Sequence, residues 1–426
     1  MSLIITLLLI VMAIAGAPLF AIIAASAMWG FWQSDIDLQV MAVEIYRVAE
    51  MPVLIAIPLF TFAGYMLGES KAPQRLVRIT DAFLGWMPGG LAIVALIACA
   101  LFTAFTGASG VTIVALGALL VPALSKAGYK ESFNLGLVTT SGSLGLLFAP
   151  SLPLILYGVI AQQMSLDIPV SIDDLFLAGI LPGLLMLFAL SLYSMWQARD
   201  LPKTREPFNG KEAWAALKDS VWEIPLPFVV LGGIYGGVFA VSEAAAITAL
   251  YVLIVSVVIR REITFTQLPV VMRDSMKLVG AILLILAVSL ASTNYMIDAG
   301  VPEAIFDYIQ QHVTSGLTFL LLLTLFLLIL GMMLDIFSAI VIMIPIILPI
   351  AMQYGIHPIH LGILFLANMQ LGYFTPPVGM NLFIASFRFN KPVMTLYKAT
   401  LPFFFILLIT VLIITYWPAL SLVFIQ

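Results

Sequence analysis

One carboxylate stands alone in a long apolar part of this chain. Between Tyr308 and Phe387, the only Asp, Glu, Lys or Arg is Asp335, which lies in the segment Gly331–Ser338. A charged side chain in an apolar setting costs free energy, so such residues usually have a function. A carboxylate among serine and backbone oxygens suits a hard cation such as Na⁺, or a proton. A helix cap at this position is the structural alternative.

A second polar segment interrupts another charge-free run. Residues 91–125 hold no charged side chain, and the centre of the run, Thr103–Gly110, is polar and contains glycine. Each flank has about 14 residues, fewer than the roughly 20 that a spanning helix needs. We therefore predict a re-entrant helical hairpin over 91–125, and a counterpart over 317–351 with its tip at Asp335. One tilted spanning helix, with glycines that serve packing, is the alternative.

Two proline-containing breaks follow the predicted hairpins, at Ala149–Pro153 and at Thr375–Asn381. Proline removes a backbone donor and disrupts the helix before it. The freed carbonyls can bind a cation, while the N-termini of half-helices can face an anionic group. A plain kink, satisfied by Ser or Thr, is the alternative for either break. We predict broken helices over 132–164 and 360–388.

The chain also resembles itself at an offset of about 226 to 230 residues. Pro122 and Pro150 match Pro349 and Pro377, and each pair is 28 residues apart. The loop after the first predicted hairpin is basic, whereas the loop after the second has no Lys or Arg. The two halves therefore point in opposite directions, as the inverted repeats of secondary transporters do. A repeat without transport is the alternative.

The composition predicts a polytopic membrane protein. Of the 426 residues, 62% are apolar and 9% are charged, against about 25% charged residues in soluble proteins. This excludes an ordinary cytosolic enzyme, and the net charge of −4 gives no indication of nucleic-acid binding. The single cysteine, Cys99, excludes a multi-cysteine metal cluster. The chain also lacks a phosphate-binding loop and the hydrolase motifs, so we expect no enzyme.

The charged residues mark the loops and the domains. If the basic clusters face the cytoplasm, every Lys and Arg except Arg47 lies inside. We predict a first inverted repeat over 1–198, a cytoplasmic linker loop over 199–223 and a second inverted repeat over 224–426. Amphipathic stretches at the membrane surface are predicted at 33–50, 69–86 and 262–275. His357 and His360 are expected in a solvated outer loop.

Across nearly its whole length, the chain resembles the large membrane subunit of a TRAP (tripartite ATP-independent periplasmic) transporter. The segments that carry the resemblance are Gly107–Thr112, Pro122–Tyr129, Ser141–Gly145 with Ala149–Pro153, Ser242–Ala246 and Pro376–Gly379. One departure is Ala149-Pro150, where many relatives have Pro-Pro. This makes the first break less symmetric with Pro376-Pro377.

The resemblance implies a fold, a function and partners. The expected fold is an all-α polytopic membrane protein with two inverted-topology repeats, in which an elevator-type transport domain, 91–165 and 317–390, moves against a scaffold. The expected function is Na⁺-coupled uptake of an organic acid, of the C4-dicarboxylate or sialic acid type, across the bacterial inner membrane. The expected partners are a small four-helix membrane subunit, a periplasmic substrate-binding protein and the lipid bilayer. A stand-alone carboxylate carrier is the alternative.

The resemblance also implies that the tips and breaks enclose the substrate and more than one Na⁺. The substrate-binding candidates are Ser109, Gly110, Ser143, Ser151, Thr375 and Asn381. The candidates for Na⁺ are Thr103, Gly107, Thr112, Asp335, Ser338, Pro376 and Gly379. We expect helix N-termini, backbone amides and hydroxyls, rather than Arg or Lys, to bind the carboxylate of the substrate.

Overall fold

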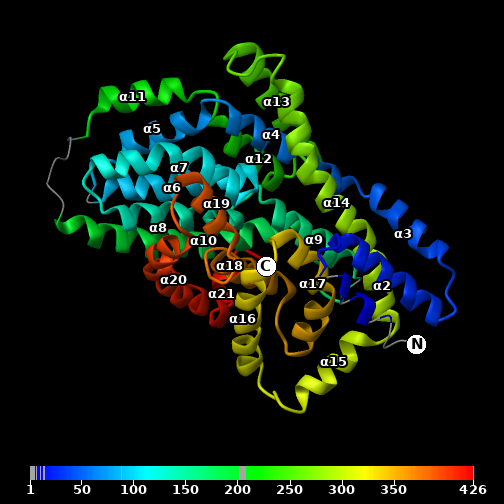
Figure 1. Cartoon of the computed structure of the whole chain (residues 1–426). Coiled ribbons are helices and arrows are strands. Elements are labelled where there is room, and N and C mark those ends of the chain that lie inside the picture. The colour runs from blue at the N-terminus through cyan, green and yellow to red at the C-terminus, as the bar shows by residue number, and fades with distance from the viewer. Residues whose placement is uncertain are drawn as a thin grey trace.

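The computed structural model describes residues 5, 7–9, 11–12, 15–87, 89–164, 166–200 and 208–425. In this part of the chain, every regular element is a helix (Figure 1). Nine of the described helices are long and apolar enough to cross a membrane, judged by length and composition. The structure therefore confirms an all-helical fold with the character of a membrane protein.

The first half of the chain supplies the helices up to the mid-chain linker. They are α2 (Leu19–Gln33), α3 (Gln39–Ala49), η1 (Pro52–Ile55), α4 (Ala56–Glu69), α5 (Ala72–Leu84), α6 (Gly90–Thr106), α7 (Ser109–Lys126), α8 (Glu131–Ser141), η2 (Leu144–Leu147), α9 (Leu152–Gln163), α10 (Ile172–Gln197) and η3 (Ala198–Asp200). The linker contributes α11 (Gly210–Asp219).

The second half begins with two apolar helices and a π-helical turn. Its elements are α12 (Pro225–Tyr235), α13 (Val241–Leu253), the π-helix η4 (Ile254–Ile259), α14 (Leu268–Asp298), α15 (Val301–Gln310), α16 (Gly316–Met333), α17 (Ile336–Gln353), α18 (Pro358–Gly372), α19 (Met380–Phe389), α20 (Val393–Tyr416) and α21 (Ala419–Leu422). The α-helices from α5 to α10 and those from α15 to α20 follow one another in a similar order of longer and shorter helices. Gly90 and Gly316, which begin α6 and α16, are 226 residues apart.

The two predicted hairpin segments each form a pair of helices. Gly107 separates α6 from α7 with a φ of +65°, a conformation that residues with a side chain rarely adopt. Leu334 and Asp335 separate α16 from α17. The arms have 17 or 18 residues instead of the expected 14 or so, and three of the four are long and apolar enough to cross a membrane. The argument from short arms was therefore wrong.

Both predicted breaks interrupt helical structure. The first lies between α8 and α9 and the second between α18 and α19. Each contains a cis peptide bond, Ala149–Pro150 in the first and Pro376–Pro377 in the second. The replacement of the first proline by alanine therefore leaves the two breaks alike in this respect, and the expected asymmetry is not seen there.

Three other expectations from the sequence need correction. The 199–223 linker is not only a loop, because its Gly210–Asp219 part forms α11; residues 201–207 lie outside the described part. Residues 262–275 do not form a separate surface helix, because the 31-residue helix α14 starts at Leu268. His360 is buried, and its ring contacts Ser421 Oγ and the Thr415 carbonyl oxygen, each at 3.2 Å.

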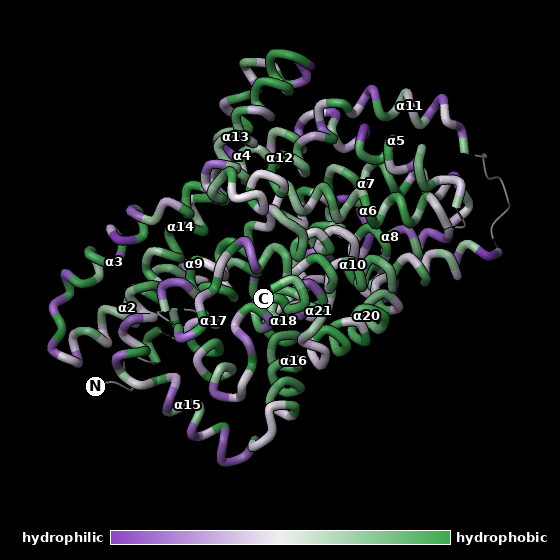
Figure 2. Tube along the Cα trace, turned by 180° about the vertical axis from the view of Figure 1, so that it is seen from behind, coloured by the Kyte–Doolittle hydropathy of each residue, from purple (hydrophilic) through white to green (hydrophobic). Residues whose placement is uncertain are grey.

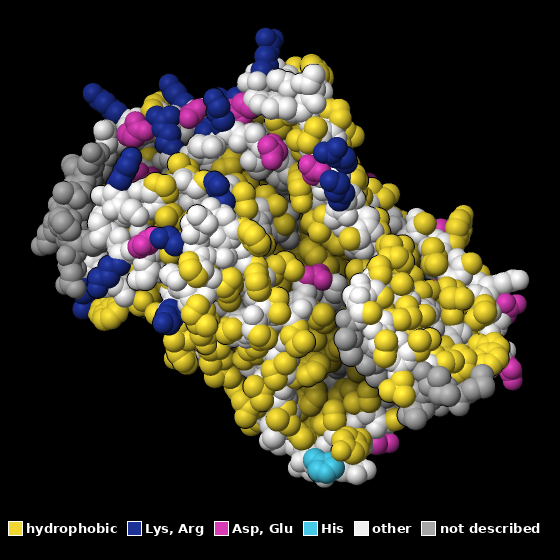
Figure 3. Space-filling model, viewed as in Figure 1, with side chains coloured by type: hydrophobic (Ala, Val, Ile, Leu, Met, Phe, Trp, Pro, Cys, Tyr) yellow, Lys and Arg dark blue, Asp and Glu magenta, His cyan; other side chains and the backbone are white. Residues whose placement is uncertain are grey.

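Apolar side chains form one large core that joins both halves of the chain. A separate small core, around Phe31, Met41 and Val288, holds α2 and α3 against α14 at the edge of the molecule (Figure 1). Hydrophilic residues gather on α3, α11 and α15 (Figure 2). Figure 3 shows Lys and Arg along the upper and left edges, over α5 and α11, and acidic side chains along the lower right edge. Acidic side chains also lie among the Lys and Arg of the upper edge, where they form ion pairs, whereas the lower right edge in this view shows acidic side chains without Lys or Arg.

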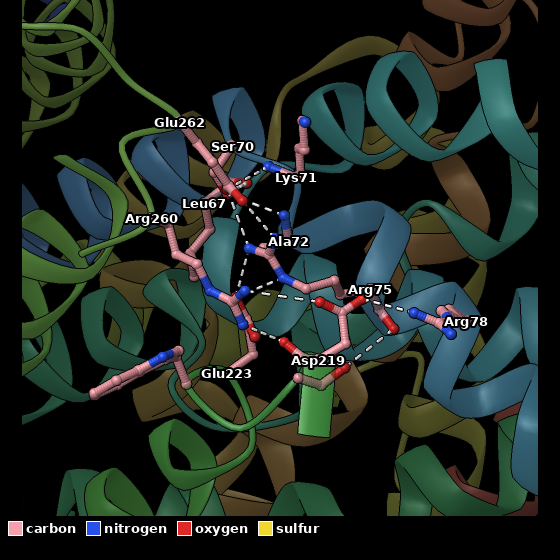
Figure 4. A network of polar contacts seen from close by, with 12 residues as sticks. Leu67, Ser70, Lys71, Ala72, Arg75, Arg78, Asp219, Glu223, Arg260 and Glu262 are labelled. Atoms are coloured by element: carbon pink, nitrogen blue, oxygen red, sulfur yellow. Dashed lines mark hydrogen bonds and ion pairs between the residues drawn. The ribbon is translucent and has the colours of Figure 1, made fainter. Parts of the chain in front are cut away.

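A buried ion-pair network holds the mid-chain segment against α5 (Figure 4). Arg75 is only 6% exposed, and its guanidinium lies 2.6 Å from Glu223 and 2.5 Å from Glu262. Glu262 also accepts a hydrogen bond from the Lys71 backbone N–H at 2.9 Å. Burial alone would raise the pKa of Glu262, but the hydrogen bonds from Arg75 and Lys71 hold it below its ordinary value. The network joins α5, the end of the linker and the turn before α14.

Candidate functional site

A cavity of about 680 Å³ lies where the two polar tips meet α4 and α14. Tyr65 and Glu69 of α4 and Ile282 of α14 line one side, and Gly107–Gly110 and Asp335–Ser338 line the other. The face drawn in Figure 3 is hollowed between its left and right parts, and an acidic side chain is visible in the hollow. The volume is in the range of small-molecule sites. The structure thus brings both predicted tips to one cavity.

Asp335 forms the N-cap of α17. Its Oδ1 accepts hydrogen bonds from the backbone N–H groups of Phe337 and Ser338, both at 3.0 Å, and its Oδ2 accepts one from Ser338 Oγ at 2.5 Å. The structural alternative weighed for this residue is therefore observed. Oδ1 thus accepts two hydrogen bonds and Oδ2 accepts one, so Oδ2 keeps a lone pair for a further partner. A role of Asp335 as a cation ligand stays a prediction.

Tyr373 joins the second break to the second tip, and the sequence analysis missed it. Its hydroxyl accepts a hydrogen bond from the Ile336 backbone N–H at 2.7 Å, and the ring lines the cavity. Gly379 adds a second link, because its N–H donates to the Met332 carbonyl at 3.1 Å. The only sequence signal for Tyr373 is its place between Gly372 and the prolines of the break.

Three oxygen atoms meet behind the first tip. Thr103 Oγ1 lies 2.6 Å from Thr112 Oγ1 and donates to the Gly142 carbonyl oxygen at 2.8 Å. Both threonines are completely buried. The three oxygens come from α6, from α7 and from the start of the first break. Hydroxyl and carbonyl oxygens are the ligands that hard cations prefer.

One hydrogen-bonded chain connects the two halves directly. Ser109 Oγ, at the first tip, donates to Asn381 Oδ1 at 2.8 Å, and Asn381 Nδ2 donates to the Thr139 carbonyl at 3.2 Å. Ser109 and Gly110 line the cavity, while Asn381 lies behind them, completely buried. Among the substrate-binding candidates, these three residues are the ones that the structure brings together at the cavity.

The remaining candidates lie elsewhere. Ser143, Ser151 and Thr375 are buried, and none is among the described residues that line the cavity. Their hydroxyls donate to nearby backbone carbonyls, those of Thr140, Leu146 and Leu371. Pro376 belongs to the cis step of the second break. The sequence grouped these residues by motif, whereas the fold uses the three hydroxyls to satisfy carbonyls that the breaks expose.

The sequence analysis also missed how closely α4 approaches the first tip. A Cβ on Gly64 would lie 2.5 Å from Thr106 Cα, and one on Gly68 would lie 3.4 Å from a Val111 side-chain carbon. The two glycines are four residues apart, so they share one face of α4. Spacing of this kind allows helices in a membrane to pack backbone to backbone. The G-x-x-x-G pattern was a readable signal.

Within the described residues, no three His, Cys, Asp or Glu side chains form a group that could hold a metal ion. The oxygen atoms at the tips are hydroxyls, carbonyls and a single carboxylate. A donor set of this kind suits a hard cation of low charge better than a transition metal.

The comparisons with known proteins agree on one family. The family model described as the DctM component of the tripartite ATP-independent periplasmic transporter matches residues 3–420. The chain is 32% identical to the C4-dicarboxylate TRAP transporter large permease protein DctM of Rhodobacter capsulatus, over 99% of this chain and 98% of that protein. It is 34% identical to the protein of the same name from Pseudomonas aeruginosa, over 90% and 88%.

A solved structure resembles the fold. The YdaH transporter of Alcanivorax borkumensis superposes with a TM-score of 0.63 over 89% of this chain and 87% of that one, at 16% sequence identity. The match to the family model covers almost the whole length of the chain, and such proteins are membrane permeases rather than enzymes. The chain therefore belongs to the DctM family, the large, multi-pass inner-membrane permeases of tripartite ATP-independent periplasmic transporters.

Proposed function

We propose that this chain carries out Na⁺-coupled uptake of an organic acid across the bacterial inner membrane, by an elevator mechanism. It acts with a small four-helix membrane subunit and receives its substrate from a periplasmic binding protein. The observation that carries the proposal is the cavity at which both polar tips face α4 and α14. A site between two sets of helices can be exposed first on one side of a membrane and then on the other.

The residues around the tips support the coupling to Na⁺. Thr103, Thr112 and the Gly142 carbonyl would hold one ion, and Asp335 with Ser338 would hold another. Bound there, Na⁺ would supply positive charge beside the substrate and the energy of its gradient. Buried polar atoms are rarely left without a partner. Yet Thr139 Oγ1, Thr140 Oγ1 and both polar atoms of the Gln370 side chain have none among the described residues, and all three residues precede a break.

The first tip supports a role in holding the substrate. Ser109 is fixed by Asn381 from the other half of the chain, while the backbone of Gly107–Gly110 faces the cavity. The N-terminus of α7 begins at Ser109, and its free N–H groups attract negative charge. These groups suit a carboxylate without determining the size of the molecule that carries it.

The substrate class is inferred from relatives. The two permeases compared above are named for C4-dicarboxylates, so succinate is the first candidate. A sialic acid, the other class that the resemblance in the sequence implies, is the second candidate. A C4-dicarboxylate carries two negative charges. It would enter a cavity whose lining contains the carboxylates of Glu69 and Asp335, and bound Na⁺ would offset that repulsion.

The position of the cavity supports an inward-facing conformation. Its lining on α4 ends at Glu69, two residues before Lys71, and its lining on α14 begins at Leu278, directly after Lys277. The cavity is thus close to the surface that carries most Lys and Arg, which the positive-inside rule assigns to the cytoplasm. In this conformation the substrate site would open to the cell interior.

Uptake into proteoliposomes tests the proposal. The chain is reconstituted with its small subunit and binding protein, and uptake of labelled succinate and labelled sialic acid is measured with and without an inward Na⁺ gradient. Uptake that requires both the gradient and the binding protein is the expected result. Equal uptake without Na⁺ would overturn the coupling, and uptake by the chain alone would favour a stand-alone carrier.

A further inference from the structure

The charge around the central cavity leaves a substrate anion without a protein cation. Among the described residues that line the cavity, the charged ones are the carboxylates of Glu69 and Asp335. An organic anion that passes between them would be repelled by both. Bound cations can offset this repulsion in the loaded state. Bound cations do not explain which protein group first binds the anion at the mouth of the cavity.

Arg388 lies at that mouth. Met380 and Ile384 of α19 line the cavity, and Arg388 follows at the same four-residue spacing, in the last turn of the helix. Residues at this spacing share one face of a helix. Arg388 Nε donates a hydrogen bond of 3.0 Å to the carbonyl of Val114, which also lines the cavity. The guanidinium is therefore anchored on α7, one helical turn beyond the lining residues of α19.

The rest of this guanidinium has no carboxylate partner within the described residues. Its one hydrogen bond uses Nε, so both terminal nitrogens keep their donors. Arg75 and Arg78 differ, because their terminal nitrogens pair with Glu or Asp side chains (Figure 4). A guanidinium with two parallel free N–H groups matches the geometry of a carboxylate. Arg388 is also exposed, so a solute can reach it.

We propose that Arg388 binds a carboxylate group of the substrate at the mouth of the cavity, on the Lys- and Arg-rich side. This inference rests on the proposed function, since it requires an organic anion as cargo. It differs from the expectation that only helix N-termini, amides and hydroxyls would contact the carboxylate. A structural explanation is that Arg388 complements the dipole of α19 and ties that helix to α7.

The test compares binding of charged and uncharged ligands. The chain is purified with its small subunit, and binding of succinate, sialic acid and the uncharged analogue succinamide is measured by titration calorimetry in Na⁺ buffer. Arg388→Gln should raise the Kd for the anionic substrate roughly tenfold, because it removes a charge-assisted hydrogen bond. Any binding of succinamide should change little. Arg388→Lys should give an intermediate Kd, because lysine keeps the positive charge but lacks the two parallel N–H groups of the guanidinium.

Lys391→Gln is the matched control. Lys391 lies three residues further along, just beyond the C-cap of α19, and pairs with Glu131 at 2.7 Å. Its removal should leave the Kd unchanged. An unchanged Kd in Arg388→Gln would overturn the inference while leaving the proposed function intact. The inference would also be overturned if Arg388→Gln and Arg388→Lys lowered the melting temperature equally and left the Kd unchanged. That result would show that Arg388 only holds α19 against α7. If the unaltered protein binds neither anion, the proposed substrate class and this inference fall together.

Discussion

At the residue scale, the two tips use different chemistry at equivalent positions. Asp335 caps α17 with its carboxylate, whereas the residue before α7, Ala108, has no side chain that can cap. The first tip has the paired hydroxyls of Thr103 and Thr112 instead. If both tips bind Na⁺, only the second does so with a formal charge. Loss of that charge should therefore affect one ion more than the other.

Substitution of Asp335 separates its two roles. Asparagine is as good an N-cap as aspartate, so Asp335→Asn should keep the melting temperature close to that of the unaltered protein. Its Na⁺-dependent uptake should fall at least tenfold, because the counter-charge of the cation is gone. Asp335→Ala should lose uptake and also about 0.5–2 kcal/mol of stability. If the Asp335→Asn variant took up substrate with normal Na⁺ dependence, the only role of Asp335 would be that of the N-cap of α17.

The Ser109–Asn381 contact predicts a second effect at this scale. Ser109→Ala removes the hydroxyl and leaves Asn381 Oδ1 buried without its donor, at a cost of about 1–3 kcal/mol. The melting temperature and the rate of uptake should both fall. Ser26→Ala is the control, since that half-buried hydroxyl donates to the Ile23 carbonyl within its own helix, α2. Equal effects of the two substitutions would show that the contact between the halves is unimportant.

Sequence reasoning identified the tips but not every neighbour of the cavity. Ser109, Gly110 and Asp335 were predictable because they interrupt apolar runs. Ser143 and Thr375 were grouped with them by motif, yet both hydroxyls donate to carbonyls three or four residues earlier. A hydroxyl in or near a helix can always take that option, and the sequence does not say which partner it chooses.

At the scale of elements, the close approach of α4 to the first tip is testable. A Cβ on Gly64 would lie 2.5 Å from Thr106 Cα, which is backbone that cannot turn aside. Gly64→Ala should force α4 away from α6, lower stability by about 1–3 kcal/mol and reduce uptake. Gly280→Ala is the matched control in α14, because a Cβ there meets nothing within 4 Å. That variant should be as stable as the unaltered protein or slightly more so.

The thermal unfolding of both glycine variants, measured in detergent, checks this prediction. If the Gly64→Ala and Gly280→Ala variants had the same melting temperature and the same rate of uptake, α4 and the first tip would not be packed as the structure has them.

The ion-pair network of α5 gives a larger expected effect. Arg75→Leu would leave Glu223 and Glu262 buried without their cation, which should cost about 3–5 kcal/mol. Arg78→Leu removes an exposed guanidinium from the same helix and should change the melting temperature little. Similar melting temperatures for the two variants would contradict the buried network.

The network also predicts a pH dependence. The pKa of Glu262 is lowered in the folded protein, so the unfolded chain takes up the proton first as the pH falls. The stabilisation by Glu262 should be complete above its ordinary pKa of 4.5 and lost as the pH drops through the lowered value. Melting curves of the unaltered protein and of Glu262→Gln should therefore differ at neutral pH and converge in acid. A constant difference across that range would contradict the assignment.

The breaks and the order of helices were readable at this scale because Gly and Pro punctuate apolar runs. The exact lengths were not. The arms of the hairpins are 17 or 18 residues long because the helices continue into the segments predicted as tips, as far as Thr106 in α6 and Met333 in α16. Helix α11 was missed because its sequence is short and rich in charged residues, which is typical of a loop. In the structure, Ala213 and Ala216 are buried against the protein. The pairing of Arg75 with Glu223 of the linker and with Glu262 before α14 joins segments far apart in the sequence, so no local pattern predicts it.

At the scale of the whole molecule, the positions of the cavity and of the charges belong together. Both tips, α4 and α14 line the cavity, and one edge of the molecule carries most Lys and Arg (Figure 3). The composition and the repeated motifs were enough to predict a membrane permease of this family. The sequence did not predict which helices would face the tips, because these are contacts between segments far apart in the chain.

The central claim is that this one cavity is presented to both sides of the membrane. The only cysteine, Cys99, is completely buried, so a cysteine placed at cavity-lining Ala108 is the one thiol that an impermeant reagent can reach. Labelling of Ala108→Cys is measured in membrane vesicles of both orientations. The account predicts labelling from the Lys- and Arg-rich face at rest, and from the opposite face once Na⁺ and substrate-loaded binding protein are supplied there. Labelling from a single face under both conditions, in a variant that still transports, would contradict it.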